Sequence, residues 1–339
     1  MAKLRIGVLY EYWWGEDEER VAEQRPKRKA PLPDVSEVYE ALKEIGHNPI
    51  YLRLDGSAAS LNEVAEAEAD LIFNLVESFA GGDTQDHNLA GYLELLGRRF
   101  TGSGSRGLHL AQDKALAKKI FAFHDIPTPE FAIVYRGRSE HAHDLSFPVI
   151  VKPAGEDGSI GIHFGAVCNS IKELMERIDY IHSEFDSPAL IEEYIEGREL
   201  YVGVLGNGKP EALPVIELDL SKLPKGTPRI AGSEVKWEEG TAAYEKTKNV
   251  FPKDLDADTL ELLQQTAVQA YQALRLYDYG RIDFRLAKDG TMYVIEVNPN
   301  PYLLQTAELA LSAKEGGKSY NDLIEGIVQS ALQRYGSGA

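Results

Sequence analysis

Three side chains that can offer oxygen ligands lie close together near the C-terminal end of the chain. Asp283 precedes an Asp-Gly dipeptide at 289–290, and Glu296 and Asn298 follow it. Asp-Gly between apolar segments is typical of a hairpin turn, and strand alternation then puts Asp283 on one face with Arg281. Oxygen-only ligation suits Mg²⁺ that is shared with a phosphate substrate. The alternative is a solvated hairpin face, but Glu296 interrupts an otherwise apolar strand, where a carboxylate needs an ion or an arginine.

A lysine ends the second segment that can do chemistry. Residues 147–152 form a predicted buried strand, Lys152 is its last residue, and a loop with three glycines follows at 153–161. Such a lysine can deliver a point charge to a phosphate, and glycines allow backbone N–H groups to approach its oxygens. No Gly-Lys-Ser/Thr follows, so this is not a Walker A loop, and for the loop taken alone a plain turn is the alternative.

The third segment is an apolar strand that becomes acidic. Residues 189–195 form the strand, and Gly197 interrupts the acidic run that follows it. Backbone groups of such a segment can bind a base, while a carboxylate binds ribose hydroxyls. A strand that leads into a solvated turn is an equally good interpretation.

The elements that must position these residues form three regions. The first hundred residues alternate strands with helices of about ten residues, which predicts a parallel sheet with helical crossovers. Residues 221–252 hold three prolines and many charges with weak periodicity, which indicates a surface lid loop. We expect an α/β protein with an N-terminal domain over 1–104, a central unit over 105–195 and a C-terminal unit over 196–339.

Composition excludes several classes of protein. The chain has 36 Lys and Arg against 54 Asp and Glu, a net charge of −18 over 339 residues, which disfavours nucleic acids and anionic membranes as partners. Its single cysteine, Cys168, excludes an intrachain disulfide and a multi-thiolate metal site. No apolar run reaches the ~18–20 residues of a membrane span, and the N-terminus does not read as a signal peptide. We expect a cytoplasmic protein that binds neither nucleic acid nor membrane.

Taken in order, six motifs spread over nearly the whole chain resemble the ATP-grasp superfamily, most closely the D-alanine–D-alanine ligase family. They lie at 92–97 with 101–104, 112–114, 147–153, 190–193, 280–283 and 296–298. The ordered set is far more specific than any single motif. The resemblance implies an α+β ATP-grasp fold, in which a parallel-sheet pre-ATP-grasp domain precedes two subdomains whose antiparallel sheets hold ATP between them.

The same resemblance implies a role for each residue of the site. The ATP-binding residues are Lys114 and Lys152 at the phosphates, Glu192, Glu193 and Ile195 at the adenine, and Glu199 at the ribose. The metal ligands are Asp283, Glu296 and Asn298, which would hold two Mg²⁺ ions, with Mn²⁺ as an alternative. The catalytic residues are Lys236, which reaches the terminal phosphate from the lid, and Arg281, which stabilises the acyl phosphate and the tetrahedral intermediate.

The implied reaction joins a carboxylate to an amine. The carboxylate attacks the terminal phosphate of ATP and gives an acyl phosphate and ADP. The amine then attacks the acyl carbon, and phosphate leaves. Because two anions meet in the first step, metal ions and cationic side chains must neutralise the growing charge.

Departures from the family lie where the amino-acid substrates would bind. Lys27 stands where the family has the glutamate that binds the substrate ammonium group. Trp237 follows the lid lysine, and Ala307 stands where the family has a serine. The candidate substrate residues are Glu77, Ser159, Trp237 and Tyr302.

These departures predict a ligase for small-molecule carboxylate and amine substrates other than D-alanine. A D-alanine–D-alanine ligase proper is one alternative, and a non-catalytic ATP-binding regulator or subunit is another. The sequence leaves open whether the chain forms a homodimer.

Overall fold

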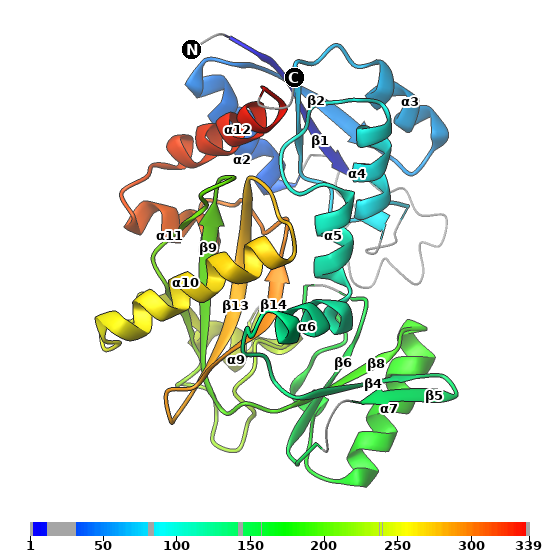
Figure 1. The fold of residues 1–339 in the computed structure, drawn as a ribbon, viewed down its shortest axis with the longest axis vertical. Coiled ribbons are helices and arrows are strands. Elements are labelled where there is room, and N and C mark those ends of the chain that lie inside the picture. Colours follow the sequence, from blue (N-terminus) through cyan, green and yellow to red (C-terminus); the bar gives the residue numbers. More distant parts are fainter. Residues whose placement is uncertain are drawn as a thin grey trace.

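The computed structural model describes residues 3–11, 32–80, 85–141, 145–156, 158–236, 238 and 240–336. Three sheets follow one another along the long axis of the molecule, each with helices packed against it (Figure 1). The first sheet is parallel and the other two are antiparallel. The predicted fold class, an α/β protein of ATP-grasp type, is therefore confirmed.

The N-terminal sheet has the strand order β2-β1-β3, and its two ladders are parallel. Its strands are β1 (Arg5–Glu11), β2 (Asn48–Leu54) and β3 (Leu71–Asn74). The helices of this region are α2 (Pro33–Ile45), α3 (Ala58–Glu66), α4 (Asp86–Leu95) and α5 (Ser105–Gln112). Helix α2 begins at Pro33, whose fixed φ suits the first turn. Gly46 ends it with φ 107°, in the left-handed conformation that favours glycine.

Alternating side chains of the N-terminal strands enter two different cores. Ile6 and Val8 of β1 pack with α2 on one face, and Leu9 packs with α3 and α4 on the other. The first face is also covered by the last helix of the chain, α12 (Tyr320–Gly336), which crosses over β1 and α2 in Figure 1. The core at this end is therefore built from both ends of the sequence.

The central sheet has the order β5-β4-β8-β6-β7, and all its ladders are antiparallel. Its strands are β4 (Phe131–Tyr135), β5 (Arg138–His141), β6 (Val149–Pro153), β7 (Val167–Cys168) and β8 (Ala189–Glu193). Helix α7 (Ile171–Phe185) covers one face through Ile178 and Ile181. Helix α6 (Lys114–Phe123) begins at the N-cap Asp113, whose carboxylate accepts a bond from the Leu116 amide at 2.9 Å. Asp113 therefore separates α6 from the preceding helix α5.

The C-terminal sheet has the order β12-β11-β9-β13-β14, with β10 paired to β9. Its strands are β9 (Gly197–Leu205), β10 (Glu211–Ala212), β11 (Ile216–Asp219), β12 (Lys248–Val250), β13 (Tyr279–Ala287) and β14 (Met292–Asn298). Helix α10 (Ala257–Ala273) packs on one face through Leu263 and Ala267, and α11 (Glu308–Glu315) lies against β9 at the end nearer the N-terminal sheet.

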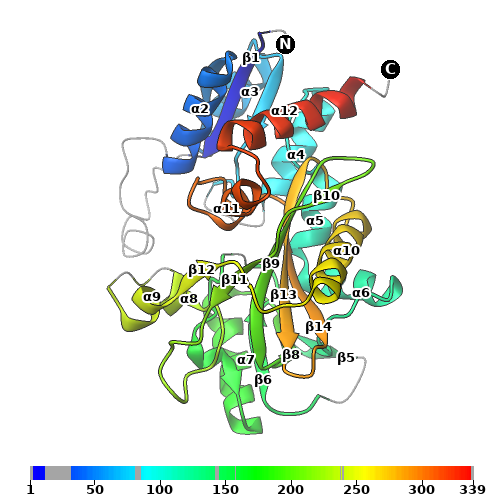
Figure 2. The same ribbon diagram turned by 90° about the vertical axis from the view of Figure 1, so that its left-hand side faces the viewer.

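The predicted lid over 221–252 is not wholly irregular. It contains the short helices α8 (Ser233–Lys236) and α9 (Ala242–Lys246) and runs into β12. Figure 2 shows this segment beside the C-terminal sheet, on the side away from α10. Leu223 and Val235 anchor it on the sheet by packing with Tyr201 and Ile216. In the described part of the chain, no helix is long and apolar enough to cross a membrane.

Candidate active site

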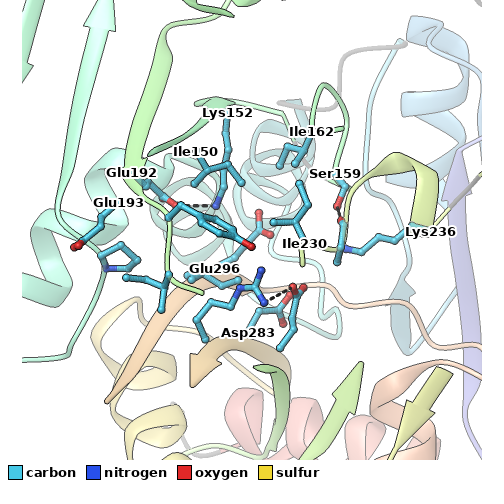
Figure 3. A pocket seen from close by; sticks show the side chains of 17 residues that line it. Ile150, Lys152, Ser159, Ile162, Glu192, Glu193, Ile230, Lys236, Asp283 and Glu296 are labelled. Carbon is cyan, nitrogen blue, oxygen red and sulfur yellow. Dashed lines mark hydrogen bonds and ion pairs between the residues drawn. The ribbon is translucent and has the colours of Figure 1, made fainter. Parts of the chain in front are cut away.

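A pocket lies between the central and C-terminal sheets, with the lid segment along one side (Figure 3). The central sheet and its loop contribute Ile150, Lys152, Ser159, Ile162 and Glu192–Ile195. The C-terminal sheet contributes Glu199, Asp283, Arg285, Ile295 and Glu296, the lid contributes Ile230, Ala231 and Lys236, and Pro129 completes the lining. The three segments that the sequence singles out therefore meet in one place.

A buried carboxylate holds two lysines at the central sheet. Glu192 is 1% exposed, accepts a hydrogen bond from Lys152 Nζ at 2.7 Å and forms an ion pair with Lys118, whose Nζ lies 2.9 Å from the other carboxylate oxygen. Burial alone would raise the pKa of Glu192, but the two lysines outweigh burial and lower it, so that its carboxylate is charged. Lys118 also donates to Thr128 Oγ1 at 2.8 Å, and Thr128 donates to the Val294 carbonyl of β14 at 2.9 Å. This chain of bonds connects the central sheet to the C-terminal one.

A second ion pair crosses between the sheets. Lys114, the first residue of α6, places its Nζ 2.9 Å from Glu296 Oε1 and 2.5 Å from the Glu156 carbonyl of the glycine loop. Burial alone would raise the pKa of Glu296, but Lys114 outweighs it and brings the pKa to about 2. The ion pair therefore keeps Glu296 ionised, as a metal ligand or a partner of a cation must be.

The acidic residues of the C-terminal sheet come from adjacent strands. Asp283 of β13 lies directly opposite Glu296 of β14. A bulge follows between Asp283 and Phe284, because Phe284 pairs with Val294 and leaves Ile295 as an extra residue. Both Ile295 and Glu296 consequently line the pocket, which strict alternation would not allow.

The donors at this position fit a hard divalent cation. Asn298 lies on β14 two residues after Glu296, and its buried Nδ2 has no hydrogen-bond partner. Asp283 is buried, and burial, opposed by Arg281 and reinforced by Glu296, raises its pKa to about 6. No group of three or more His, Cys, Asp or Glu residues that could hold a metal occurs in the described ranges, and the predicted donors are two carboxylates and one side-chain amide. Oxygen donors of this kind suit Mg²⁺.

Arg281 is the cation beside these acids. Its Nε and Nη2 donate to the two oxygens of Asp283 at 2.7 and 2.9 Å, and its Nη1 donates to Glu308 Oε2 at 3.2 Å. Its guanidinium carbon also lies 4.9 Å from the ring centroid of Tyr201. The arginine expected to face the acyl group is thus held in one orientation by the protein itself.

The opposite end of the pocket offers backbone and carboxylate groups. Glu193, Tyr194 and Ile195 follow Glu192 at the end of β8, and all line the pocket. Glu199 of β9 accepts from the Tyr201 hydroxyl at 2.9 Å and lies 3.5 Å from Arg285 Nη1. Carboxylates and backbone groups from both sheets therefore line this part of the pocket.

The lid is fastened to the glycine loop. Ser159 has φ 65° and donates from Oγ to the Ala231 carbonyl at 2.9 Å, and the Phe164 amide donates to Glu234 Oε1 at 2.8 Å. Lys236, at the end of α8, lines the pocket, and its side chain makes no hydrogen bond or ion pair with other residues of the described ranges. In Figure 3 its side chain approaches from the side of Ser159 and Ile230. Lys236 is therefore a pocket cation with its charge available for a ligand.

The structure does not bring all the predicted residues into the pocket lining. Lys114, Arg281 and Asn298 lie beside the lining through the contacts above. Glu77 is exposed, with its amide donating to Glu11 Oε2 at 3.2 Å, and neither Glu77 nor Tyr302 is part of the lining. Trp237 and the basic run with Lys27 lie outside the described residues.

Among the residues that were not predicted are Lys118 and Glu308, which pair with charged groups of the site. Lys118 is 1% exposed and stands four residues after Lys114, on the same face of α6, which is the signal that could have revealed it. Glu308 follows Ala307 at the start of an apolar run, but only the packing of α11 brings it to Arg281.

Comparisons with known proteins agree with this geometry. The model of the "D-ala D-ala ligase C-terminus" family matches residues 120–329. The chain is 32% identical over 325 residues to the uncharacterized protein y4sG of Sinorhizobium fredii, covering 93% of each chain. It is also 32% identical to a D-alanine–D-alanine ligase of Desulfotalea psychrophila, covering 82% of this chain and 84% of that one. The structure of the Bacillus anthracis D-alanine–D-alanine ligase complexed with ATP has the same fold, with a TM-score of 0.74, 24% identity and coverage of 99% and 100%.

A pocket between two antiparallel sheets, lined by lysines from the central sheet and the lid segment and by paired acids from the C-terminal sheet, defines an ATP-grasp enzyme. The chain belongs to the D-alanine–D-alanine ligase family. It is accordingly an ATP-dependent ligase that forms a carbon–nitrogen bond between small-molecule substrates.

Proposed function

We propose that this ligase activates a small carboxylate as an acyl phosphate and joins it to an amine, with release of ADP and phosphate. The observation that carries the proposal is the meeting of Lys152 and Lys236, from a sheet and a lid, with Asp283 and Glu296 in one pocket. Cations alone would bind any polyanion, whereas cations that face a pair of metal-binding carboxylates suit a nucleotide triphosphate with its metal.

ATP would lie along the pocket in one direction. The base takes the end at Glu193 and Ile195, where backbone groups are available, and the ribose takes Glu199. The phosphates then reach Lys152 and Lys236. Glu192 contributes indirectly, because its carboxylate is occupied by the two lysines and so fixes the position of Lys152.

Asp283, Glu296 and Asn298 would hold Mg²⁺, and Mn²⁺ offers the same preference for oxygen donors. The ion, when bound, supplies positive charge that offsets repulsion between the phosphates and the attacking carboxylate. Two ions fit the family pattern. In the structure Lys114 pairs with Glu296 and keeps it ionised, while Arg281 pairs with Asp283 and opposes the effect of burial on its pKa.

The protein's own residues account for the rest of the reaction. Lys236 neutralises the terminal phosphate as the substrate carboxylate attacks it. Arg281 stabilises the oxyanion when the amine adds to the acyl carbon, because its guanidinium is already oriented. The bonded lid, through Ser159 and Ala231, excludes water that would hydrolyse the acyl phosphate.

A phosphate-release screen tests the proposal. The full chain, ATP and Mg²⁺ are incubated with pairs of amino acids, amines and dipeptides, and products are identified by mass spectrometry. We expect ADP, phosphate and an amide, all lost with EDTA and restored by Mg²⁺ or Mn²⁺. Formation of AMP and pyrophosphate would overturn the acyl-phosphate mechanism.

The names of the relatives support a second candidate, a D-alanine–D-alanine ligase proper. An assay with ATP and D-alanine as the sole amino acid separates the two candidates. Only a D-alanine–D-alanine ligase proper would release phosphate from D-alanine alone as fast as from the best substrate pair of the screen. If ATP binds and no pair yields ADP, the chain is an ATP-binding regulator or subunit instead.

A further inference from the structure

One residue of the lid is bonded through its backbone to two side chains that line the pocket. The amide of Arg229 donates to the Tyr194 hydroxyl at 2.9 Å, and its carbonyl accepts from Arg285 Nη2. Tyr194 follows β8 of the central sheet, whereas Arg285 lies on β13 of the C-terminal sheet. The backbone of Arg229 is therefore held from both of the sheets that form the pocket.

Arg229 is also the residue at which the lid passes from one sheet to the other. Its Nη1 donates to the carbonyls of Leu220 and Leu223 at 2.7 and 2.8 Å, and both leucines pack in the core on the C-terminal sheet. Beyond Arg229, residues 231–234 are bonded to the glycine loop and its continuation at 159–164. The position of Arg229 thus sets where the second half of the lid begins.

The two side chains that hold Arg229 also belong to the end of the pocket proposed for the base and ribose. Arg285 is 4% exposed, and its Nη1 lies 3.5 Å from Glu199 Oε2 and donates to the Gly197 carbonyl at 3.2 Å. Tyr194 packs in the small core that contains Ile230, the lid residue next to Arg229. A ligand that orders this end of the pocket therefore orders the side chains that hold the lid.

The consequence at the other end of the pocket concerns Lys236 and water. Lys236 ends the helix α8 that follows the bonded residues 231–234, and in the proposed function it neutralises the terminal phosphate. If Arg229 moved away from the two sheets, the path of the lid to Lys236 would loosen and water would enter. Water would then attack the acyl phosphate in place of the amine, which returns the carboxylate and releases phosphate without an amide.

We propose that Tyr194 and Arg285 are positioning residues that tie the lid to the bound nucleotide. The base and ribose hold these two side chains, the side chains hold Arg229, and Arg229 fixes the start of the segment that leads to Lys236. The inference rests on the proposed function and goes beyond it, because it gives residues at the base end of the pocket a role in excluding water at the phosphate end.

Hydrogen exchange of the full chain, read by mass spectrometry of lid peptides, tests the tie directly. Tyr194→Phe keeps the ring and removes only the hydroxyl that accepts from Arg229. With ATP and Mg²⁺ bound, we expect exchange over 229–236 to be about two- to tenfold faster in this variant than in wild type, the effect of one hydrogen bond. Exchange in α10 should not change, which separates a loosened lid from general destabilisation.

Three comparisons sharpen this measurement. Tyr135→Phe, at a half-buried tyrosine on β4 of the same sheet, is the matched control and should behave as wild type. Arg285→Lys keeps the charge beside Glu199 but not the planar fork that also reaches the Arg229 carbonyl, so it should loosen the same peptides. Inorganic tripolyphosphate with Mg²⁺ has no base or ribose, and at saturation it should protect 229–236 less than ATP does.

An activity assay gives a second readout that a purely structural role would not move. The full chain, ATP and Mg²⁺ receive a pool of free amino acids of both chiralities, and phosphate and amide are measured in the same samples. The phosphate released in excess of amide should rise about two- to tenfold over wild type in Tyr194→Phe and in Arg285→Lys. Tyr135→Phe should show no such rise.

The inference is overturned if Tyr194→Phe matches Tyr135→Phe both in exchange over 229–236 and in excess phosphate. It is also overturned if tripolyphosphate protects the lid as well as ATP does. Failure of the proposed function looks different, because the wild type would then form no amide from any pool. Hydrogen exchange with bound ATP would still decide in that case whether Tyr194 and Arg285 hold the lid.

Discussion

The ion cluster around Glu192 gives a prediction whose size follows from burial. Glu192 is 1% exposed, Lys118 is 1% exposed and Lys152 is 8% exposed, so both lysines depend on this one carboxylate. Glu192→Gln removes the charge and keeps the shape, which leaves two buried ammonium groups without a counter-ion. Breaking a buried ion pair by removing one partner costs about 3–5 kcal/mol. We expect a loss of that size in the free energy of unfolding at pH 7.

A second substitution separates charge from general damage. In Glu192→Gln/Lys118→Met only Lys152 remains, and its Nζ faces the pocket, where water can solvate it. The double variant should therefore be more stable than Glu192→Gln alone, although it carries one more change. Such non-additivity is the signature of a shared interaction.

Urea unfolding at pH 7, followed by far-UV circular dichroism and tryptophan fluorescence together, measures the effect. Coincident transitions are required before free energies are compared. Glu193→Gln, the next residue on the same strand but half-buried at the pocket, is the control and should stay within about 0.5 kcal/mol of wild type. The pKa of Glu192 is lowered in the folded protein. The difference in the free energy of unfolding between Glu192→Gln and wild type should therefore shrink as the pH falls below 4.5.

The reasoning is refuted if Glu192→Gln matches Glu193→Gln in stability. It is also refuted if the double variant is no more stable than the single one.

Three further predictions concern the catalytic arginine, the lid and the junction with the N-terminal sheet. Arg281→Ala should lower turnover about 10²–10³-fold in phosphate release, and a loss below tenfold would contradict its role at the oxyanion. Ser159→Ala removes the 2.9 Å bond to the Ala231 carbonyl, so the KM for ATP should rise about 2- to 10-fold in initial-rate assays, and an unchanged KM would argue against a lid contact. Burial, opposed by Arg334, raises the pKa of Asp278 from 3.8 to about 6, so the folded state binds its proton more tightly and the wild type loses stability as the pH rises through this window. The free energy of unfolding of Asp278→Asn, measured with urea, should therefore rise by about 3 kcal/mol relative to that of the wild type between pH 4 and pH 7. A difference between the two proteins that does not change with pH would contradict the assignment.

Local patterns predicted much of the site. The Asp-Gly turn indicated the hairpin that pairs Asp283 with Glu296, and Glu296 was singled out because a carboxylate interrupted an apolar strand. Lys152 was predicted from its place at the end of a buried strand, where it lies in the structure. These features depend on neighbours in the sequence, so periodicity and turn chemistry are sufficient to find them.

Other features required the folded chain. The bulge that turns both Ile295 and Glu296 to the pocket has no local signal in the sequence. Glu192 was assigned to the adenine segment, but its carboxylate binds two lysines that lie 40 and 74 residues before it.

The sequence by itself determined the fold class, the family and many of the residues that line the pocket, because these follow from short motifs in a fixed order. The tertiary structure decided how those charges are paired. Only packing brings Glu308 to Arg281 and α12 onto the N-terminal sheet, since such contacts join segments whose separation along the chain leaves no pattern to read. The surroundings of Arg281 were therefore decided by the fold, through the electrostatic pairing of residues that the sequence keeps apart.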